Sequence, residues 1–170
     1  DDQLNALFYG PVCVAVMLIV VGAAFILVEN LRAGKKPAIR SVSKLDYWTA
    51  AIIGMFQMIA AIFPGTSRSG ATIVGALLIG VSRVTAAEFT FYLAIPVIFG
   101  ASLLKLVKFG LDFTAPELVF LLVGMVVAFG VSIFVIRFLM DYIKKHDFTV
   151  FGWYRIVLGV LVILYFTVLK

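Results

Sequence analysis

The residues that most clearly could bind or react with a ligand lie in the seven-residue segment PGTSRSG, residues 64–70. Its glycines allow sharp turns that bring backbone N–H groups to one side of a loop. Its hydroxyl side chains donate hydrogen bonds, and its arginine presents a planar fork that matches two phosphate oxygens. This set of donors in one short loop predicts an anion site, most simply a site for phosphate.

Arg68 carries most of that prediction, because it lies between apolar segments and has no acidic residue within ten positions on either side. An arginine at membrane depth costs roughly 2.5–3.5 kcal/mol on insertion scales. A bound anion would offset that cost. Small and hydroxyl residues also pack and cap membrane helices, but this alternative leaves the unpaired arginine unexplained.

Arg68 is the fixed cation at the centre of the predicted site. Gly65 and Gly70 shape the backbone, and Gln57, on the apolar segment before the loop, is expected to face the same cavity. A helix predicted to begin at Ala71 would point its positive end at the anion. The expected hydroxyl donors are Thr66, Ser67, Ser69 and Thr72.

Other polar residues are weaker candidates. Arg83 and Glu88 follow the second short apolar segment and are interpreted as a solvated pair or as helix caps. Arg155, beside two aromatic residues, is interpreted as an anchor at the membrane interface. His146 is interpreted as part of a basic surface loop. A P-loop is excluded, because it needs a lysine where this chain has Ala71.

The composition places the chain in a membrane. It is 64% hydrophobic and only 14% charged, with a mean hydropathy of +1.15, whereas soluble domains carry about a quarter charged residues. The net charge of +5 does not indicate nucleic-acid binding, because five of the fourteen basic residues fall in one loop, residues 32–44. The single cysteine, Cys13, excludes a disulfide framework within the chain.

Segment lengths predict the architecture that positions the loop. Four apolar segments reach the roughly 20 residues that a membrane-crossing helix needs: residues 7–28, 89–107, 118–140 and 153–169. The apolar segments on either side of the loop, residues 47–63 and 71–81, are too short to cross. Since exposed irregular backbone is not tolerated in lipid, the prediction is an all-α integral membrane protein with four transmembrane helices and a re-entrant helix–loop–helix, residues 47–81. Residues 1–170 would form a single transmembrane domain.

The charge distribution supports the re-entrant interpretation. If residues 47–81 enter and leave on one side, the loops at 29–46, 82–88 and 141–152 share a face that holds most of the basic residues. By the positive-inside rule, that face is cytoplasmic.

The motif resembles a known family of membrane enzymes. The segment PGTSRSGAT, the later Gly-Val-Ser-Arg at residues 80–83, Glu-Phe at 88–89, Pro96 and Tyr-Arg at 154–155 are similar to the second half of undecaprenyl-pyrophosphate phosphatases. The resemblance implies a multi-pass enzyme of the bacterial inner membrane that hydrolyses C55 polyprenyl pyrophosphate to the monophosphate. That step recycles the lipid carrier for peptidoglycan synthesis and is associated with bacitracin resistance.

The resemblance also implies residue roles and partners. Arg68 would grip the pyrophosphate and, with Ser67, act in catalysis, while the other predicted residues line the pocket. The family fold has inverted repeats, so this chain would be one half, the C-terminal part of a longer chain. The implied partners are the lipid, the bilayer and the N-terminal half of the same protein, with a homodimer left open.

This sequence departs from the family in one respect. The family's acidic motif and its histidine-bearing loop have no counterpart here. The implied divalent cation, Mg²⁺ or Ca²⁺, would therefore have its ligands outside this chain, and the segment alone is expected to lack phosphatase activity.

Two other functions remain open from the residues. Secondary transporters and flippases also bind anions where broken helices meet at mid-membrane, and a phosphate channel is a variant of that idea. A structural membrane subunit would use the loop only to pack helices.

Overall fold

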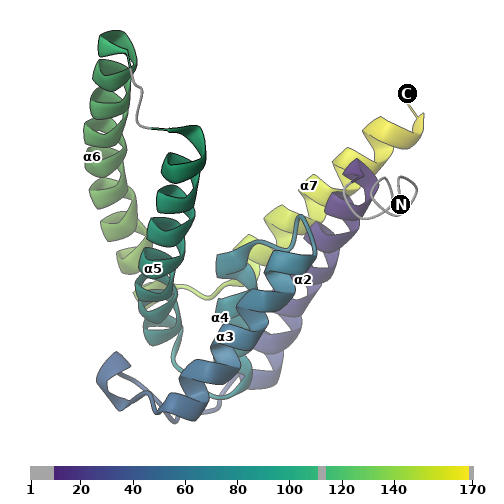
Figure 1. Cartoon of the computed structure of the whole chain (residues 1–170). Coiled ribbons are helices and arrows are strands. Elements are labelled where there is room, and N and C mark those ends of the chain that lie inside the picture. The colour runs from purple at the N-terminus through teal and green to yellow at the C-terminus, as the bar shows by residue number, and fades with distance from the viewer. Residues whose placement is uncertain (1–9, 111–113, 169–170) are drawn as a thin grey trace. The chain divides into compact units, whose positions relative to one another are not determined.

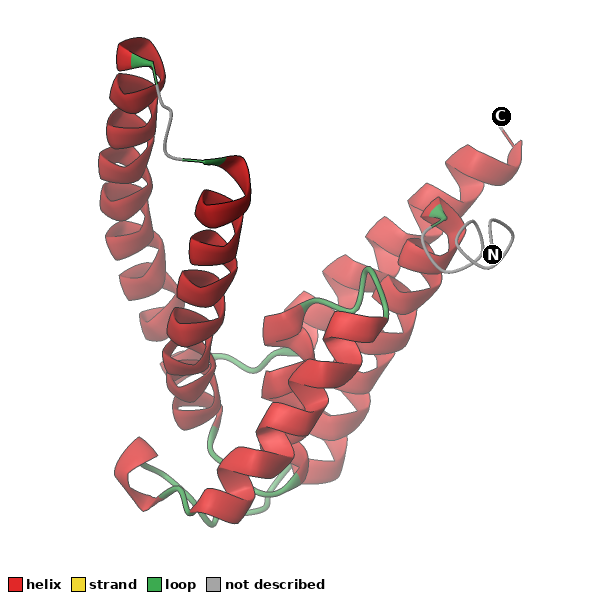
Figure 2. Cartoon of the chain, viewed as in Figure 1, coloured by secondary structure: helices red, strands yellow, loops and turns green. Residues whose placement is uncertain are grey.

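The chain is described by a computed structural model that covers residues 10–110 and 114–168. Figures 1 and 2 show helices joined by loops, and one isolated parallel bridge joins Ile39 to Val81 within the described residues. The short 3₁₀ helix η1 spans Val42–Lys44. The α-helices are α2 Pro11–Arg32, α3 Tyr47–Ile62, α4 Arg68–Leu78, α5 Arg83–Phe109, α6 Ala115–Lys145 and α7 Thr149–Val168.

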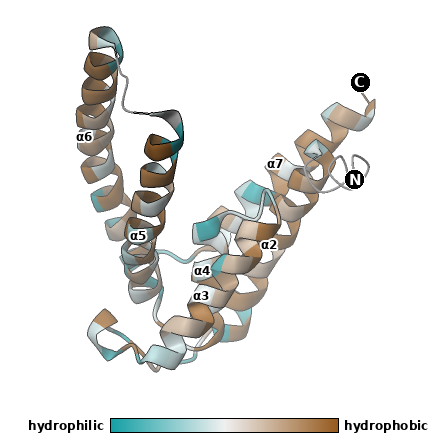
Figure 3. Cartoon of the chain, viewed as in Figure 1, coloured by the Kyte–Doolittle hydropathy of each residue, from teal (hydrophilic) through white to brown (hydrophobic). Residues whose placement is uncertain are grey.

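Four of these helices are long and apolar enough to cross a membrane, namely α2, α5, α6 and α7. Figure 3 shows hydrophobic colours along most of their length, and hydrophilic colours mainly at loops and helix ends. The prediction of an all-α integral membrane protein is confirmed.

The apolar segments predicted for the long helices were shorter at one or both ends than the helices themselves. α5 begins at Arg83 instead of residue 89, because the Ser82 hydroxyl caps it by accepting a hydrogen bond from the Thr85 N–H at 3.3 Å. α7 begins at Thr149 instead of residue 153, and α6 extends three residues before and five residues beyond the predicted segment 118–140. α2 continues to Arg32, four residues past the predicted end, while predicted residues 7–9 lie outside the described part. Hydropathy marks the apolar middle of a helix, whereas polar caps set its ends.

The chain divides into two compact units, residues 1–90 with 146–170, and residues 91–145. The prediction of a single transmembrane domain stays a prediction. In the second unit, residues 115–138 of α6 are all exposed. An apolar helix with this exposure suits contact with lipid or with other membrane helices. The loop and its supporting helices belong to the first unit.

Within the first unit, α2 packs along α7 through small residues. A Cβ on Gly152 would lie 2.7 Å from the carbonyl oxygen of Gly22, and a Cβ on Gly159 would lie 2.7 Å from that of Ala15. These pairs show that the two helices run antiparallel in close contact. Glycine lets membrane helix backbones approach in this way.

A helical hairpin, α3 and α4, lies beside α2 (Figure 1). Asp46 caps α3 by accepting a hydrogen bond from the Thr49 N–H at 3.1 Å. Phe56 of α3 packs on Gly75 of α4, where a Cβ would approach the ring to 2.6 Å. The open end of the hairpin lies at the C-terminal end of α2, because Arg32 Nε donates to the Leu77 carbonyl oxygen at 2.8 Å.

The closed end of the hairpin lies about halfway along α7. A Cβ on Gly65 would lie 2.6 Å from the Val14 carbonyl oxygen, and the neighbouring Ala15 is level with Gly159. Gly159 is about ten residues, roughly 15 Å of helix, from either end of α7. The hairpin therefore carries its loop to the middle of a helix that is long enough to cross a membrane.

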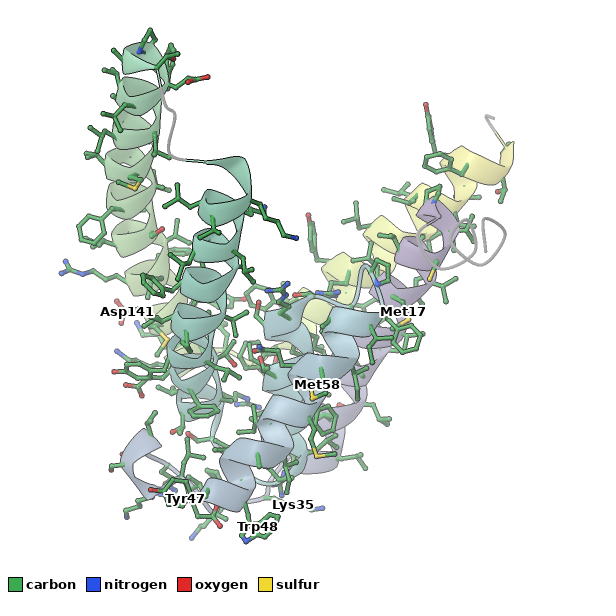
Figure 4. All side chains as sticks on the ribbon, viewed as in Figure 1. Met17, Lys35, Tyr47, Trp48, Met58 and Asp141 are labelled. Carbon is green, nitrogen blue, oxygen red and sulfur yellow. The ribbon has the colours of Figure 1, made fainter. Side chains whose placement is uncertain are left out.

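At the end of the first unit away from the loop, the buried carboxylate of Glu29 connects three segments. Glu29, 5% exposed, accepts hydrogen bonds from Arg83 at 2.6–3.0 Å and from the Phe148 N–H at 3.0 Å. The start of α5 and the start of α7 are thereby fixed to the C-terminal end of α2. Figure 4 shows Lys35, Tyr47 and Trp48 at this same end of the unit. The basic loop and the open end of the hairpin thus share one end of the first unit, while the re-entrant course of residues 47–81 in a membrane stays a prediction.

Candidate functional site

The loop between α3 and α4 is shaped by close backbone contact with α2. Gly65 has φ +89°, a left-handed conformation that favours glycine, and its Cα faces the backbone of Val14. A side chain at this position would be strained by the backbone angle and would also meet the Val14 carbonyl. The predicted role of Gly65 in shaping the loop thus has two physical causes.

The helix after the loop begins earlier than predicted. α4 begins at Arg68 instead of Ala71, so the last three residues of the segment 64–70 belong to its first turn. Ser67 is the N-cap: its hydroxyl accepts the Gly70 N–H at 3.3 Å, and its carbonyl accepts the Ala71 N–H at 3.0 Å. The prediction missed this boundary because the serine that starts the helix was assigned only to the loop.

This boundary decides which backbone donors are available. Gly70 N–H is taken up by the cap, whereas the N–H groups of Ser67, Arg68 and Ser69 have no partner among the described residues. Unpaired N–H groups at a helix N-terminus, together with the helix dipole, attract anions. The donors lie two to four residues earlier than the helix start predicted at Ala71.

Ser67 has an unusual backbone, with φ +62°. A non-glycine residue in this region costs of order 1–3 kcal/mol and persists only where its surroundings enforce it. Such strain clusters at functional sites, and here it falls on a residue predicted to be catalytic.

Arg68 has its side chain exposed and without a hydrogen-bond or ion-pair partner in the described part of the chain. Ser67 and Ser69 are exposed beside it. The beginning of α4 is hydrophilic in Figure 3, within a unit whose helices are otherwise largely apolar. One cation, two hydroxyls and three unpaired N–H groups therefore lie on consecutive residues.

The remaining predicted residues are placed differently. Thr66 is 3% exposed, and its hydroxyl has no partner among the described residues. Thr72 is fully buried, and its hydroxyl lies 2.9 Å from that of Thr90 and 3.0 Å from the Ser69 carbonyl oxygen. Gln57 is half-buried on α3. Contact of these three side chains with a ligand stays a prediction.

Arg155 is the residue that sequence reasoning misplaced. Its Nη2 donates to the carbonyl oxygens of Gly65 and Thr66 at 2.9 and 3.1 Å, so it braces the loop and is not an interfacial anchor. The signal was available: Arg155 lies in an apolar helix between Gly152 and Gly159, and the cost of an arginine at depth applies to it as to Arg68. The neighbouring aromatic residues suggested the interface instead.

Arg83 also differs from its predicted role, because its carboxylate partner is Glu29 and not Glu88. Glu88 is half-buried on α5. The pair is separated by 54 positions in the sequence, so no local pattern could have predicted it.

The described residues do not fit a divalent cation. Residues 10–110 and 114–168 contain no group of three His, Cys, Asp or Glu side chains placed to hold one. Both oxygens of the buried Glu29 accept hydrogen bonds from Arg83, and the loop itself contains only neutral and cationic side chains. No chemical step is therefore assigned to a metal in this part of the molecule.

Together these features define an all-α membrane protein in which a helical hairpin presents a donor-rich loop halfway along a membrane-length helix. The chain matches the family Bacitracin resistance protein BacA over residues 1–161, and it belongs to that family.

Curated relatives match along nearly the whole chain. It is 66% identical over 167 residues to an undecaprenyl-diphosphatase of Desulfitobacterium hafniense, covering 98% of this chain and 60% of the relative. It is 62% identical to undecaprenyl-diphosphatase 1 of Clostridium acetobutylicum (99% and 61% covered) and 59% identical to an undecaprenyl-diphosphatase of Acetivibrio thermocellus (100% and 62%). The chain thus spans about three-fifths of the length of these relatives.

Proposed function

We propose that this chain carries the pyrophosphate-binding loop of an undecaprenyl-pyrophosphate phosphatase, which hydrolyses a C55 polyprenyl pyrophosphate to the monophosphate. The family membership and the relatives' names support the reaction class. The single observation that carries the binding role is the run of unpaired donors on Ser67, Arg68 and Ser69.

The loop suits a pyrophosphate for electrostatic reasons. Arg68 can donate two parallel hydrogen bonds to one phosphate group. The three backbone N–H groups and the positive end of α4 can receive the other oxygens. Phosphoryl transfer depends mainly on positioning and on neutralising the charge that spreads over the phosphate oxygens. The loop supplies both without having to reorganise, since its backbone is fixed by α2 and α7.

Ser67 is proposed to act beside Arg68. Its hydroxyl oxygen accepts a hydrogen bond from Gly70, which leaves the hydroxyl proton available to a phosphate oxygen. A divalent cation, Mg²⁺ or Ca²⁺, is proposed to bind through residues outside this chain. The expectation that this chain alone lacks activity finds no support in the comparisons, because relatives match it along nearly all its length.

The proposed location is the bacterial inner membrane, with several crossings and the basic end of the first unit in the cytoplasm. A Lys36→Cys variant in a Cys13→Ser background tests the orientation. A membrane-impermeant maleimide should label it in inverted vesicles and not in intact cells; labelling only in intact cells would overturn this orientation.

The reaction is tested by phosphate release from a polyprenyl pyrophosphate in detergent micelles, with the proposed N-terminal half of the protein present. Arg68→Ala should lower kcat/KM by about 10²–10³-fold, the usual effect of removing a donor that stabilises transition-state charge. Arg40→Ala is the matched control, because Arg40 is an exposed arginine beside the open end of the hairpin. It should leave the rate unchanged.

The same preparations separate the rival functions. A transporter or flippase would move the phosphorylated lipid between leaflets of a vesicle without releasing phosphate. A packing subunit would lose thermal stability in Arg68→Ala without any ligand effect. Absence of phosphate release by the unmodified protein would contradict the proposed reaction.

A further inference from the structure

We propose that Arg155 is a positioning residue that holds the backbone of residues 65–67 in the conformation that presents the Ser67 N–H to the anion. The inference rests on the proposed function of the loop, and it adds a residue from α7 to a site that the sequence assigned to residues 57–72.

The contacts of Arg155 are directed at the loop backbone. A single nitrogen, Nη2, bridges two consecutive carbonyl oxygens, those of Gly65 and Thr66, at 2.9 and 3.1 Å. The other terminal nitrogen lies against the first turn of α4, since a Cβ on Gly70 would be 3.3 Å from Nη1. The guanidinium is therefore held between the loop and the helix that follows it, and the absence of a side chain at Gly70 leaves it that space.

The geometry of the peptide bond gives this bracing a consequence. A trans peptide is planar, so its C=O and N–H point in opposite directions. The Thr66 carbonyl points at Arg155, and the N–H of the same peptide, which belongs to Ser67, must then point away from α7. That N–H is one of the three donors without a partner in the described part of the chain. Arg155 thus fixes the direction of a donor that it does not touch.

The strain at Ser67 explains why a brace is needed. With φ +62°, Ser67 would relax to an ordinary conformation unless neighbouring groups prevented it. Arg155 fixes the peptide before Ser67, and the cap to Gly70 N–H fixes the residues after it. Removal of either constraint should let the loop backbone turn.

Arg155 also adds charge behind the loop. It has no carboxylate partner among the described residues, and its Nε has no hydrogen-bond partner there. Arg68 on the exposed side and Arg155 on the α7 side give the loop two uncompensated cations. A pyrophosphate, which carries more negative charge than a single phosphate ester, is the ligand class that matches this arrangement.

The test compares Arg155→Met, which removes the donors, with Arg155→Lys, which keeps the charge and one nitrogen donor. Arg155→Met should raise KM for the lipid pyrophosphate by about tenfold, because a turned loop loses a charge-assisted contact to the substrate. Arg155→Lys should restore part of that loss, because a single nitrogen can bridge both carbonyl oxygens. A merely structural role would lower the amount of folded protein and leave KM unchanged. Arg40→Met is the control and should keep the original KM.

Amide hydrogen exchange at Thr66, whose N–H donates to the Phe63 carbonyl oxygen at 3.3 Å, provides a second measurement that does not depend on turnover. In the protein without substrate, exchange at Thr66 should be faster in Arg155→Met, while α3 and the start of α5 keep their original rates. Gly70→Ala, which pushes on Nη1, should shift exchange in the same direction and serves if Arg155→Met fails to fold.

Unchanged Thr66 exchange in Arg155→Met and Gly70→Ala would overturn the proposal, even if the phosphatase reaction holds. An unchanged KM in a folded Arg155→Met would also overturn it, because the loop would then keep its conformation without these donors. If the unmodified protein released no phosphate, the proposed function would fail, and the exchange measurement would still decide whether Arg155 orders the loop.

Discussion

At the scale of single residues, glycines and arginines shape the loop in different ways. Gly65 and Gly70 leave the space that Val14 and Arg155 occupy, so each glycine acts by what packs against it. Arg68 and Arg155 differ in the same way: one is exposed with no partner in the described chain, and the other is directed at backbone carbonyls. Residue type alone does not reveal the different roles of the two glycines or of the two arginines, because each role depends on what the neighbouring helices place beside the residue.

Gly65→Ala should destabilise the protein for two reasons that can be separated. The left-handed backbone costs about 1–2 kcal/mol for a residue with a Cβ, and overpacking against the Val14 backbone adds about 1–3 kcal/mol. Gly34→Ala is the matched control, because Gly34 also has positive φ, at +74°, but nothing lies within 4 Å of an added Cβ. Thermal unfolding of the three proteins measures the difference, and equal losses in both variants would contradict the packing account.

At the scale of elements, α2 and α7 form the support on which the hairpin rests. Their glycine contacts allow the antiparallel approach, and α7 then places Arg155 level with the closed end of the hairpin. The Glu29 carboxylate joins the start of α5 and of α7 to α2 at the other end. The loop geometry therefore depends on the packing of helices outside the hairpin.

Gly152→Ala tests that dependence. Its Cβ would lie 2.7 Å from the Gly22 carbonyl oxygen, a backbone atom that cannot move without separating the helices. The variant should lose about 1–3 kcal/mol of stability and part of its phosphatase activity, because Arg155 lies one turn further along α7. Gly124→Ala in α6, where an added Cβ meets nothing within 4 Å, should change neither quantity. Full activity in Gly152→Ala would show that the loop does not depend on this packing.

The sequence predicted the elements better than their contacts. Hydropathy and length were enough for the four long helices and for the two short ones around the loop, since these properties are local. The true start of α4 at Arg68 was missed because a serine cap and a polar loop look alike in the sequence. The Glu29–Arg83 pair and the brace from Arg155 were not predicted, because they join residues 54 and about 90 positions apart, and only the folded helices bring them together.

At the scale of the whole molecule, the first unit has two regions with different chemistry. One end gathers the basic loop, the open end of the hairpin and the Glu29 cluster. The middle of α7 meets the loop with its unpaired donors. This separation suits the proposed function, in which the loop binds the anionic head of a membrane lipid.

The central claim is that the backbone N–H groups of residues 67–69 bind a pyrophosphate. Amide hydrogen exchange across residues 65–69, measured with and without inorganic pyrophosphate, tests it most directly. We expect pyrophosphate to slow exchange at Ser67, Arg68 and Ser69 in the unmodified protein, and Arg68→Ala to weaken the effect greatly. Exchange that pyrophosphate leaves unchanged at all three residues, in a protein that still releases phosphate from the lipid, would contradict it.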